Sequence, residues 1–128
     1  MKQYLKANEK SGKLTVLINK GQILWVDLPK APGSVQSGRR PVVVVSNDRA
    51  NKFSPVLLVA PLTSRPKKNL PTHASLTLEE AYGMYADSTV LCEQLFTVDK
   101  TSIVDIVGRV SEEAITKINR ALSVSLAL

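Results

Sequence analysis

The stretch GSVQSGRRPVVVVSND (residues 33–48) places four consecutive valines behind two arginines and a proline. An unbroken run of valines, without polar residues at alternate positions, is typical of a strand that is buried on both faces. The run before the arginines is rich in Gly and Ser, as flexible loops are. Arg39 and Arg40 thus put two permanent cations at the mouth of a buried strand, and the rest of the chain must explain them.

The chain predicts a small barrel around this strand. Residues 21–28 (GQILWVDL) and 56–62 (VLLVAPL) are expected to be strands, whereas residues 30–38 and 47–54 are polar and turn-like. Further strands are expected at residues 14–18, 40–46, 72–78, 88–95 and 103–110. Residues 111–126 predict a helix, with Ser111 as N-cap and Ile115, Ile118, Leu122 and Leu126 at helical spacing. Five to seven short strands with one C-terminal helix make a mostly antiparallel α+β barrel.

Length and composition favour a single soluble domain. The 128 residues include 44% hydrophobic residues, which suffices for a core. The domain is expected over residues 21–128, after a partly flexible N-terminal extension at residues 1–20. No apolar run could cross a bilayer, no signal peptide is present, and the single cysteine, Cys92, cannot form an internal disulfide. These features predict a cytoplasmic protein without a membrane partner.

The positive charge is concentrated in the middle of the chain. The net charge is +6, and residues 30–68 hold eight basic residues against one acid, Asp48. From residue 69 onward, four basic residues face eight acids. This asymmetry favours a polyanionic partner, with nucleic acid ahead of a membrane surface. The alternative is ordinary solubilising charge on loops.

Motifs for metal, nucleotide and histidine- or cysteine-based catalysis are missing from the sequence. It contains no CxxC or HExxH for zinc and no GxxxxGK[ST] or GxGxxG for nucleotide phosphates. His73, the only histidine, is interpreted as a surface or strand-edge imidazole rather than a catalytic base. Cys92 lies in the apolar segment TVLCEQL and is interpreted as a buried small hydrophobe. No metal and no cofactor are therefore predicted.

One arginine and one threonine stand at the ends of two predicted buried strands. Arg40 precedes the valine strand, and Thr63, followed by Ser64, comes at the end of the next one. If these strands are antiparallel neighbours, the two side chains lie together, and a guanidinium with a hydroxyl is a good phosphate receptor. In the alternative interpretation, Arg40 is a cation facing water and Thr63 a strand-edge residue. Trp25 is interpreted as core or dimer interface rather than a base-stacking residue.

Several motifs in order resemble the MazF/PemK family of toxin endoribonucleases. They are G-x-I-x-W-V-D-L-P, G-S-x-Q-x-G-x-R-P-V-V-V-V-S-N-D, N-x-x-S-P, V-A-P-L-T-S, L-P-T-H and L-C-E-Q-L-x-T-V-D-K. The resemblance implies an SH3-like barrel with a C-terminal helix, a homodimer, and metal-independent cleavage of single-stranded RNA. It also implies an acidic antitoxin whose disordered segment folds over the groove and competes with RNA. DNA is not expected as a partner of this chain alone.

The resemblance assigns roles to individual residues. The catalytic arginine and threonine of the family fall on Arg40 and Thr63. Residues 33–38 correspond to the loop that frames the RNA. Contacts to RNA are expected from Ser34, Gln36, Arg39, Asn47, Ser64 and Gln94, of which Arg39 is assigned to phosphate positioning. Val35 departs from the family, because many members carry a glutamate at this position of the loop.

The chemistry expected from the resemblance uses the nucleophile that RNA itself carries. The 2′-hydroxyl attacks the phosphorus, Arg40 neutralises the developing charge and Thr63 donates a hydrogen bond to the same phosphate. The products are a 2′,3′-cyclic phosphate and a 5′-hydroxyl. Two alternatives are a non-enzymatic CcdB-like toxin acting on DNA gyrase and a simple RNA-binding module.

Overall fold

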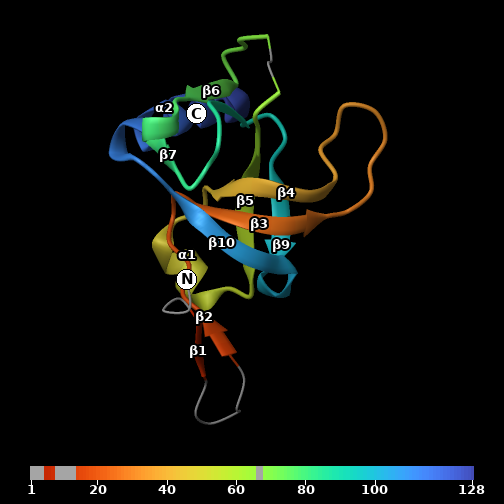
Figure 1. The fold of residues 1–128 in the computed structure, drawn as a ribbon, viewed down its shortest axis with the longest axis vertical. Helices are drawn as coiled ribbons and strands as arrows, with labels where there is room; N and C mark the ends of the chain where they lie inside the picture. Colours follow the sequence, from red (N-terminus) through yellow and green to blue (C-terminus); the bar gives the residue numbers. More distant parts are fainter. Residues whose placement is uncertain (1–4, 8–13, 66–67) are drawn as a thin grey trace.

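Val42–Val44 form the last three residues of β4 (Gly38–Val44), and Val45 directly follows it, in the computed structural model, which describes residues 5–7, 14–65 and 68–128 (Figure 1). β4 pairs antiparallel with β3 (Gln22–Leu28) along one edge and with β5 (Val56–Thr63) along the other. A strand that is paired on both edges satisfies its backbone hydrogen bonds inside the sheet. β4 is therefore a central strand of the sheet, with β3 and β5 on its two sides.

The sheet continues on both sides of β3, β4 and β5, and every pairing in it is antiparallel. Eight strands take part, in the order β6-β8-β5-β4-β3-β10-β7, with β9 paired to β5 beside this path. Their bounds are β6 (His73–Leu76), β7 (Ala81–Tyr82), β8 (Ser88–Leu91), β9 (Phe96–Asp99) and β10 (Ile103–Val110). The sheet curls into a nearly closed barrel with α2 (Glu112–Leu126) against β6 (Figure 1). The expected barrel with a C-terminal helix is thus confirmed.

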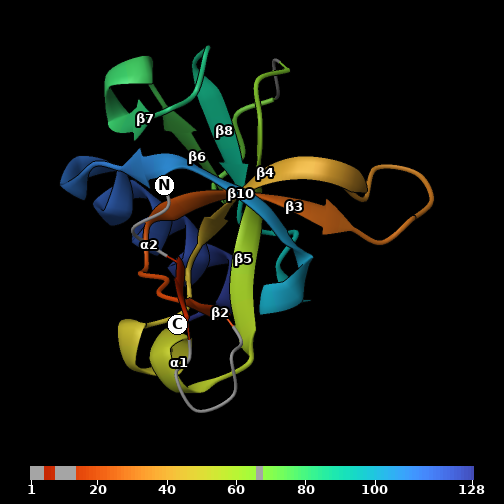
Figure 2. The same cartoon turned by 60° about the horizontal axis from the view of Figure 1, so that its bottom comes forward.

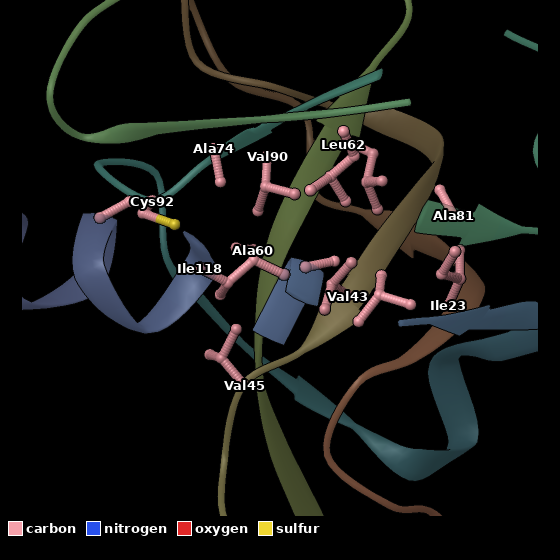
Figure 3. Packing of buried hydrophobic residues seen from close by; sticks show 14 residues of the cluster. Ile23, Val43, Val45, Ala60, Leu62, Ala74, Ala81, Val90, Cys92 and Ile118 are labelled. Atoms are coloured by element: carbon pink, nitrogen blue, oxygen red, sulfur yellow. The ribbon is translucent and has the colours of Figure 1, made fainter. Parts of the chain in front are cut away.

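Two apolar clusters lie on the two faces of the sheet. Val43 and Val45 belong to the cluster that includes residues of α2, whereas Val42 and Val44 belong to the other. Figure 3 shows the first cluster, with Val43 and Val45 of the valine stretch and Ile118 of α2 among its labelled side chains. All four valines are at most 7% exposed. The prediction of a strand buried on both faces is confirmed, because alternate side chains point to opposite faces.

The C-terminal helix α2 is capped and held as its sequence predicts. The Ser111 hydroxyl accepts a hydrogen bond from the Ala114 amide at 3.1 Å. Lys117 donates to Glu80 Oε1 at 2.9 Å, and this contact lowers the pKa of the Glu80 carboxyl. Leu126, expected on the buried stripe, is 49% exposed instead. In the described part of the chain, no helix is both long and apolar enough to span a membrane.

Some segments differ from the sequence-based expectation. Residues 47–54 contain the short helix α1 (Asp48–Phe53) rather than a turn, because Asn47 caps it by accepting from the Ala50 amide at 2.8 Å. The strand expected at residues 88–95 ends at Leu91, and β9 begins after a turn. The N-terminal extension, expected to be partly flexible, contributes β1 (Leu5–Ala7), paired with β2 (Leu14–Val16). The short 3-10 turns are η2 (Leu78–Glu80) and η3 (Lys100–Ser102).

Gly108 allows β7 to approach β10, and replacing it with alanine should open this contact. A Cβ on Gly108 would lie 1.8 Å from the carbonyl oxygen of Tyr82. Gly108→Ala should therefore lower the free energy of unfolding in urea by about 2–4 kcal/mol. Gly33→Ala is the control, since Gly33 has open space around it at a φ of +62° and should lose only about 1 kcal/mol. Equal losses in both variants would contradict the packing argument.

Candidate functional site

A groove of about 510 Å³ opens where β4 begins and β5 ends. Strands and turns from five parts of the chain line it: Trp25, Arg39, Arg40, Pro41, Leu62, Thr63, Ser64, Arg65, Gly83, Met84, Tyr85, Asp105 and Val107. Three arginines in this set face one acidic residue, Asp105, so the lining favours an anionic ligand.

Arg40 and Thr63 come together through the register of β4 and β5. The observed register ends with the pair Val42–Pro61, and continuing it by two residues toward the groove would set Arg40 opposite Thr63. Both residues line the groove. Directly opposed residues of antiparallel strands have Cβ atoms about 5 Å apart. The two side chains therefore line one groove from strands whose other ends are fixed in the core.

The two adjacent arginines have different partners. Arg39 Nε donates to Asp27 Oδ1 at 3.0 Å, and this ion pair is exposed on the surface. Arg40 Nε donates to the carbonyl oxygen of Ser37 at 3.0 Å, and Arg40 has no ion pair within the described residues. Arg40 therefore lines the groove without a paired carboxylate among the described residues to neutralise its guanidinium. Arg40 is the stronger candidate for holding a phosphate.

The Thr63 hydroxyl is held in one orientation. Thr63 is 8% exposed, and its Oγ1 accepts a hydrogen bond from the Arg65 amide at 3.2 Å. Since the oxygen is used as an acceptor, the hydroxyl proton remains to be donated. A nearly buried side chain on a rigid strand presents this donor with little loss of conformational entropy. Thr63 can thus donate to an anion that Arg40 binds.

Gln94 holds the loop that joins β3 and β4. Its Oε1 accepts from the Gln36 amide at 2.8 Å, and its Nε2 donates to the Ser34 carbonyl oxygen at 3.1 Å. Figure 2 shows this loop projecting from the barrel beyond the ends of β3 and β4. Ser37 of the same loop accepts from Arg40. Gln94 therefore acts on the site through the loop, and Val35, 44% exposed, lies in the segment that it holds.

The remaining residues proposed from the sequence fall into two places. Ser64 lines the groove beside Thr63. Asn47 lies beyond the opposite end of β4 from Arg40, where its side chain caps α1, and it does not line the groove. A strand rises about 3.3 Å per residue, so seven residues separate Asn47 from Arg40 by roughly 20 Å. The structure does not bring Asn47 to the other site residues.

Some residues of the groove are not predicted from the sequence, because no motif in the surrounding sequence marks them as site residues. Tyr85 and Met84 stand in an ordinary-looking turn, and Asp105 and Val107 lie on a strand far along the chain. Trp25, interpreted above as core or interface, is half-buried and lines the groove. Only Arg65, two residues after Thr63, could have been found from its neighbour.

Cys92 takes the buried position expected for it, whereas the His73 side chain is 5% exposed on the edge strand β6, so of its two expected positions it has the strand edge and not the surface. His73 Nδ1 lies 2.9 Å from the Lys68 carbonyl oxygen, and Nε2 lies 2.8 Å from Glu93 Oε2, which ties β6 to the turn after β8. Burial raises the pKa of the Cys92 thiol to about 12, so it stays protonated. Among the described residues, no group of three or more His, Cys, Asp or Glu could hold a metal ion.

Comparisons of the sequence with known proteins point to one family. The family model described as PemK-like, MazF-like toxin of type II toxin-antitoxin system matches residues 19–126. Endoribonuclease EndoA of Bacillus subtilis is 39% identical over 114 residues, which cover 88% of this chain and 97% of that protein. Endoribonuclease MazF of Staphylococcus saprophyticus is 35% identical over 113 residues, covering 88% and 93%.

Solved structures share the fold. An endoribonuclease from Mycobacterial species in complex with its cognate antitoxin has a TM-score of 0.73 at 24% identity, covering 87% of this chain and 96% of that one. MazF (Form-I) from Deinococcus radiodurans also has a TM-score of 0.73, at 22% identity, covering 89% and 100%. At these identities the likeness establishes the fold alone.

Removing the Gln94 side chain should free the loop at residues 33–38. Gln94→Ala deletes both hydrogen bonds to the loop, so amide exchange there should become about five- to tenfold faster. Hydrogen–deuterium exchange with mass spectrometry measures this on peptides that contain Gln36. Glu93→Ala is the matched control, because the neighbouring Glu93 contacts His73 and not the loop. Unchanged exchange in Gln94→Ala would mean that other contacts hold the loop.

Proposed function

The chain belongs to the family of PemK-like, MazF-like toxins of type II toxin-antitoxin systems, and we propose that its groove is the site where it cuts RNA. The motif resemblance is confirmed by this membership. The protein is an endoribonuclease toxin of a type II system, as relatives at 35–39% identity over most of their length are endoribonucleases. The alternative as a CcdB-like gyrase inhibitor is not favoured by these relatives.

The observation that carries the site assignment is that Arg40 and Thr63 line one groove from adjacent ends of two paired antiparallel strands. In our proposal, the scissile phosphate of single-stranded RNA binds between these side chains. The 2′-oxygen forms a bond to phosphorus, and the bond from phosphorus to the 5′-oxygen breaks. The 2′-hydroxyl gives up its proton and the leaving 5′-oxygen takes one, which leaves a 2′,3′-cyclic phosphate and a 5′-hydroxyl.

Each of the two side chains has a separate task in this step. Arg40 binds the non-bridging oxygens and neutralises the charge that grows on them, which a guanidinium does at any ordinary pH. Thr63 donates a hydrogen bond to the same phosphate and keeps it in line with the attacking oxygen. No residue of the chain is needed as nucleophile, because the ribose supplies it. The reaction as proposed needs no metal ion.

Contacts outside the phosphate are assigned by position. Arg39 and Ser64 are proposed to bind neighbouring phosphates, since both line the groove. Ser34 and Gln36 are proposed to contact bases from the loop that Gln94 holds, because unstacked single strands expose their base edges. Asn47 is left out, as it lies beyond the far end of β4.

The partners and location proposed follow from the family. Related structures include an endoribonuclease in complex with its cognate antitoxin. We propose that this chain forms a homodimer and is inhibited by an acidic antitoxin segment, which the arginine-rich groove would attract. A cytoplasmic location is proposed because the substrate, messenger RNA, is found there.

Loss of the Arg40 guanidinium should nearly abolish cleavage. Arg40→Ala should slow cutting of total bacterial RNA in EDTA by at least about 1,000-fold, because the charge on the phosphate is no longer neutralised. Sequencing of the new 5′-hydroxyl ends measures the cuts. Arg39→Ala should lose less than about tenfold in cleavage activity, since Arg39 forms an exposed ion pair with Asp27, which partly neutralises its charge. Arg49→Ala, on exposed α1 outside the groove, is the unchanged control. Full activity in a folded Arg40→Ala protein would sink the assignment.

The Thr63 hydroxyl should matter for kcat more than for KM. Thr63→Val keeps the buried shape but removes the donor, and kcat should fall about 100- to 1,000-fold. Thr63→Ser retains the hydroxyl and should stay within about tenfold of the wild type. Thermal unfolding of both variants checks that the end of β5 is intact. If valine and serine variants are equally active, Thr63 serves the strand and not the reaction.

A further inference from the structure

Tyr85 is the most exposed large apolar side chain among the described residues, and it lines the groove that holds Arg40 and Thr63. It is 98% exposed, in the turn that joins β7 to β8. Tyr85 has no role in the cleavage reaction proposed above. An aromatic ring left fully in water forgoes the burial that usually stabilises such side chains, so a ligand that covers it would gain apolar contact.

The turn that carries Tyr85 is held from several directions. Gly83 has a φ of +101°, and a Cβ there would lie 2.3 Å from the Val107 carbonyl oxygen, so the turn lies flat on β10. Met84 packs against the buried cluster on the α2 side, and its amide donates to the Ala81 carbonyl at 3.2 Å. Asp87 accepts from the Leu78 amide at 3.0 Å. Tyr85 therefore projects from a fixed backbone, and little backbone entropy is lost when a ligand binds it.

The turn also brings Tyr85 close to the scissile phosphate proposed above. β8 follows the turn, and its residue Thr89 is the register partner of Thr63. Four residues of chain separate Tyr85 from Thr89, which is about 14 Å at full extension. Figure 1 shows the turn after β7 reaching toward the start of β3 and the end of β10 before the chain returns into β8. The exposed ring and the Arg40–Thr63 pair thus belong to one continuous surface.

The chemistry of this surface matches a nucleotide more closely than a plain anion. Arg40 and Arg65 supply cations for phosphate, whereas Tyr85, with Met84 and Trp25 in the same lining, supplies flat and apolar contact area. A base in single-stranded RNA offers an unpaired ring face, and aromatic side chains are its usual stacking partners. An acidic peptide would use the arginines but would leave the tyrosine ring uncovered.

We propose that Tyr85 stacks on a base of the bound RNA, adjacent to the phosphate held by Arg40 and Thr63. The inference rests on the proposed function, since it takes single-stranded RNA as the ligand. Stacking tolerates any base because every base has a ring face, so Tyr85 contributes affinity and positioning rather than base identity. The loop at residues 33–38 keeps the task of reading base edges.

The test measures binding of an RNA that cannot react. A short, mixed-sequence RNA with 2′-fluoro riboses lacks the nucleophile, and its Kd is measured by fluorescence anisotropy at one fixed salt concentration. Tyr85→Ala should weaken binding about 5- to 150-fold, the range expected for loss of one base–aromatic stack. Tyr85→Phe should bind within about twofold of wild type, because stacking needs the ring and not the hydroxyl. Phe53→Ala removes an exposed aromatic outside the groove and should change nothing.

A second probe separates stacking from other roles of the tyrosine. An abasic ribose-phosphate chain of the same length should bind wild type and Tyr85→Ala equally, since no base is present to stack. If Tyr85→Ala weakened binding of the abasic chain as much as binding of the RNA, the inference would be overturned. It would also be overturned if Tyr85→Phe bound the RNA as weakly as Tyr85→Ala does. A Tyr85→Ala protein with altered oligomeric state on size exclusion would also overturn it, because the ring would then belong to an interface between copies.

The proposed function can fail separately from this inference. If wild type cuts RNA but Tyr85→Ala binds as tightly as wild type, only the stacking is wrong. If wild type binds RNA in a Tyr85-dependent way without cutting it, the stacking stands and the catalytic proposal falls. If wild type does not bind single-stranded RNA, both are wrong.

Discussion

The structure depends on the second half of β4, which is enclosed on all four sides. This part of β4 has strand neighbours on both edges and an apolar cluster on each face, so the side chains of Val42–Val45 are shielded from solvent. Burial of each valine contributes roughly 1.5–3 kcal/mol relative to exposure. A strand held in this way cannot slip by one residue, because a slip would exchange the side chains of its two faces. Its register with β5 is therefore fixed, and the ends of both strands are fixed with it.

The candidate site lies where this enclosure ends. Arg40 comes two residues before the buried valines, and Thr63 comes at the matching end of β5. The core thus sets the spacing of the cation and the hydroxyl, while the loop supported by Gln94 supplies the Ser37 carbonyl that orients Arg40. Preorganisation of this kind places charge and donor before a ligand arrives, which is the main source of electrostatic stabilisation in enzymes. Asp27 neutralises the adjacent Arg39, so the two arginines are not equivalent.

The sequence predicts the secondary structure of long apolar segments, but not that of the short elements. The valine strand and the helix capped by Ser111 have strong local patterns, and both are confirmed. The sequence of α1 predicts a turn, because its six residues are too few and too polar to show a helical period. The cap from Asn47 and the contacts of Asn51 stabilise the helix instead. β7 has two residues and exists only because Gly108 lets it approach β10.

The sequence by itself determined the barrel class, the family, and the candidacy of Arg40 and Thr63, because motifs and buried strands are local in the chain. Only the tertiary structure decided which charges are free and which surfaces meet. Arg39 is neutralised by a residue on the neighbouring strand, and Asn47 is carried to the far end of β4 by seven residues of extended chain. Tyr85 reaches the groove from a turn twenty-two residues after Thr63. Such relations come from strand pairing between distant segments, and no local pattern of residue types encodes them.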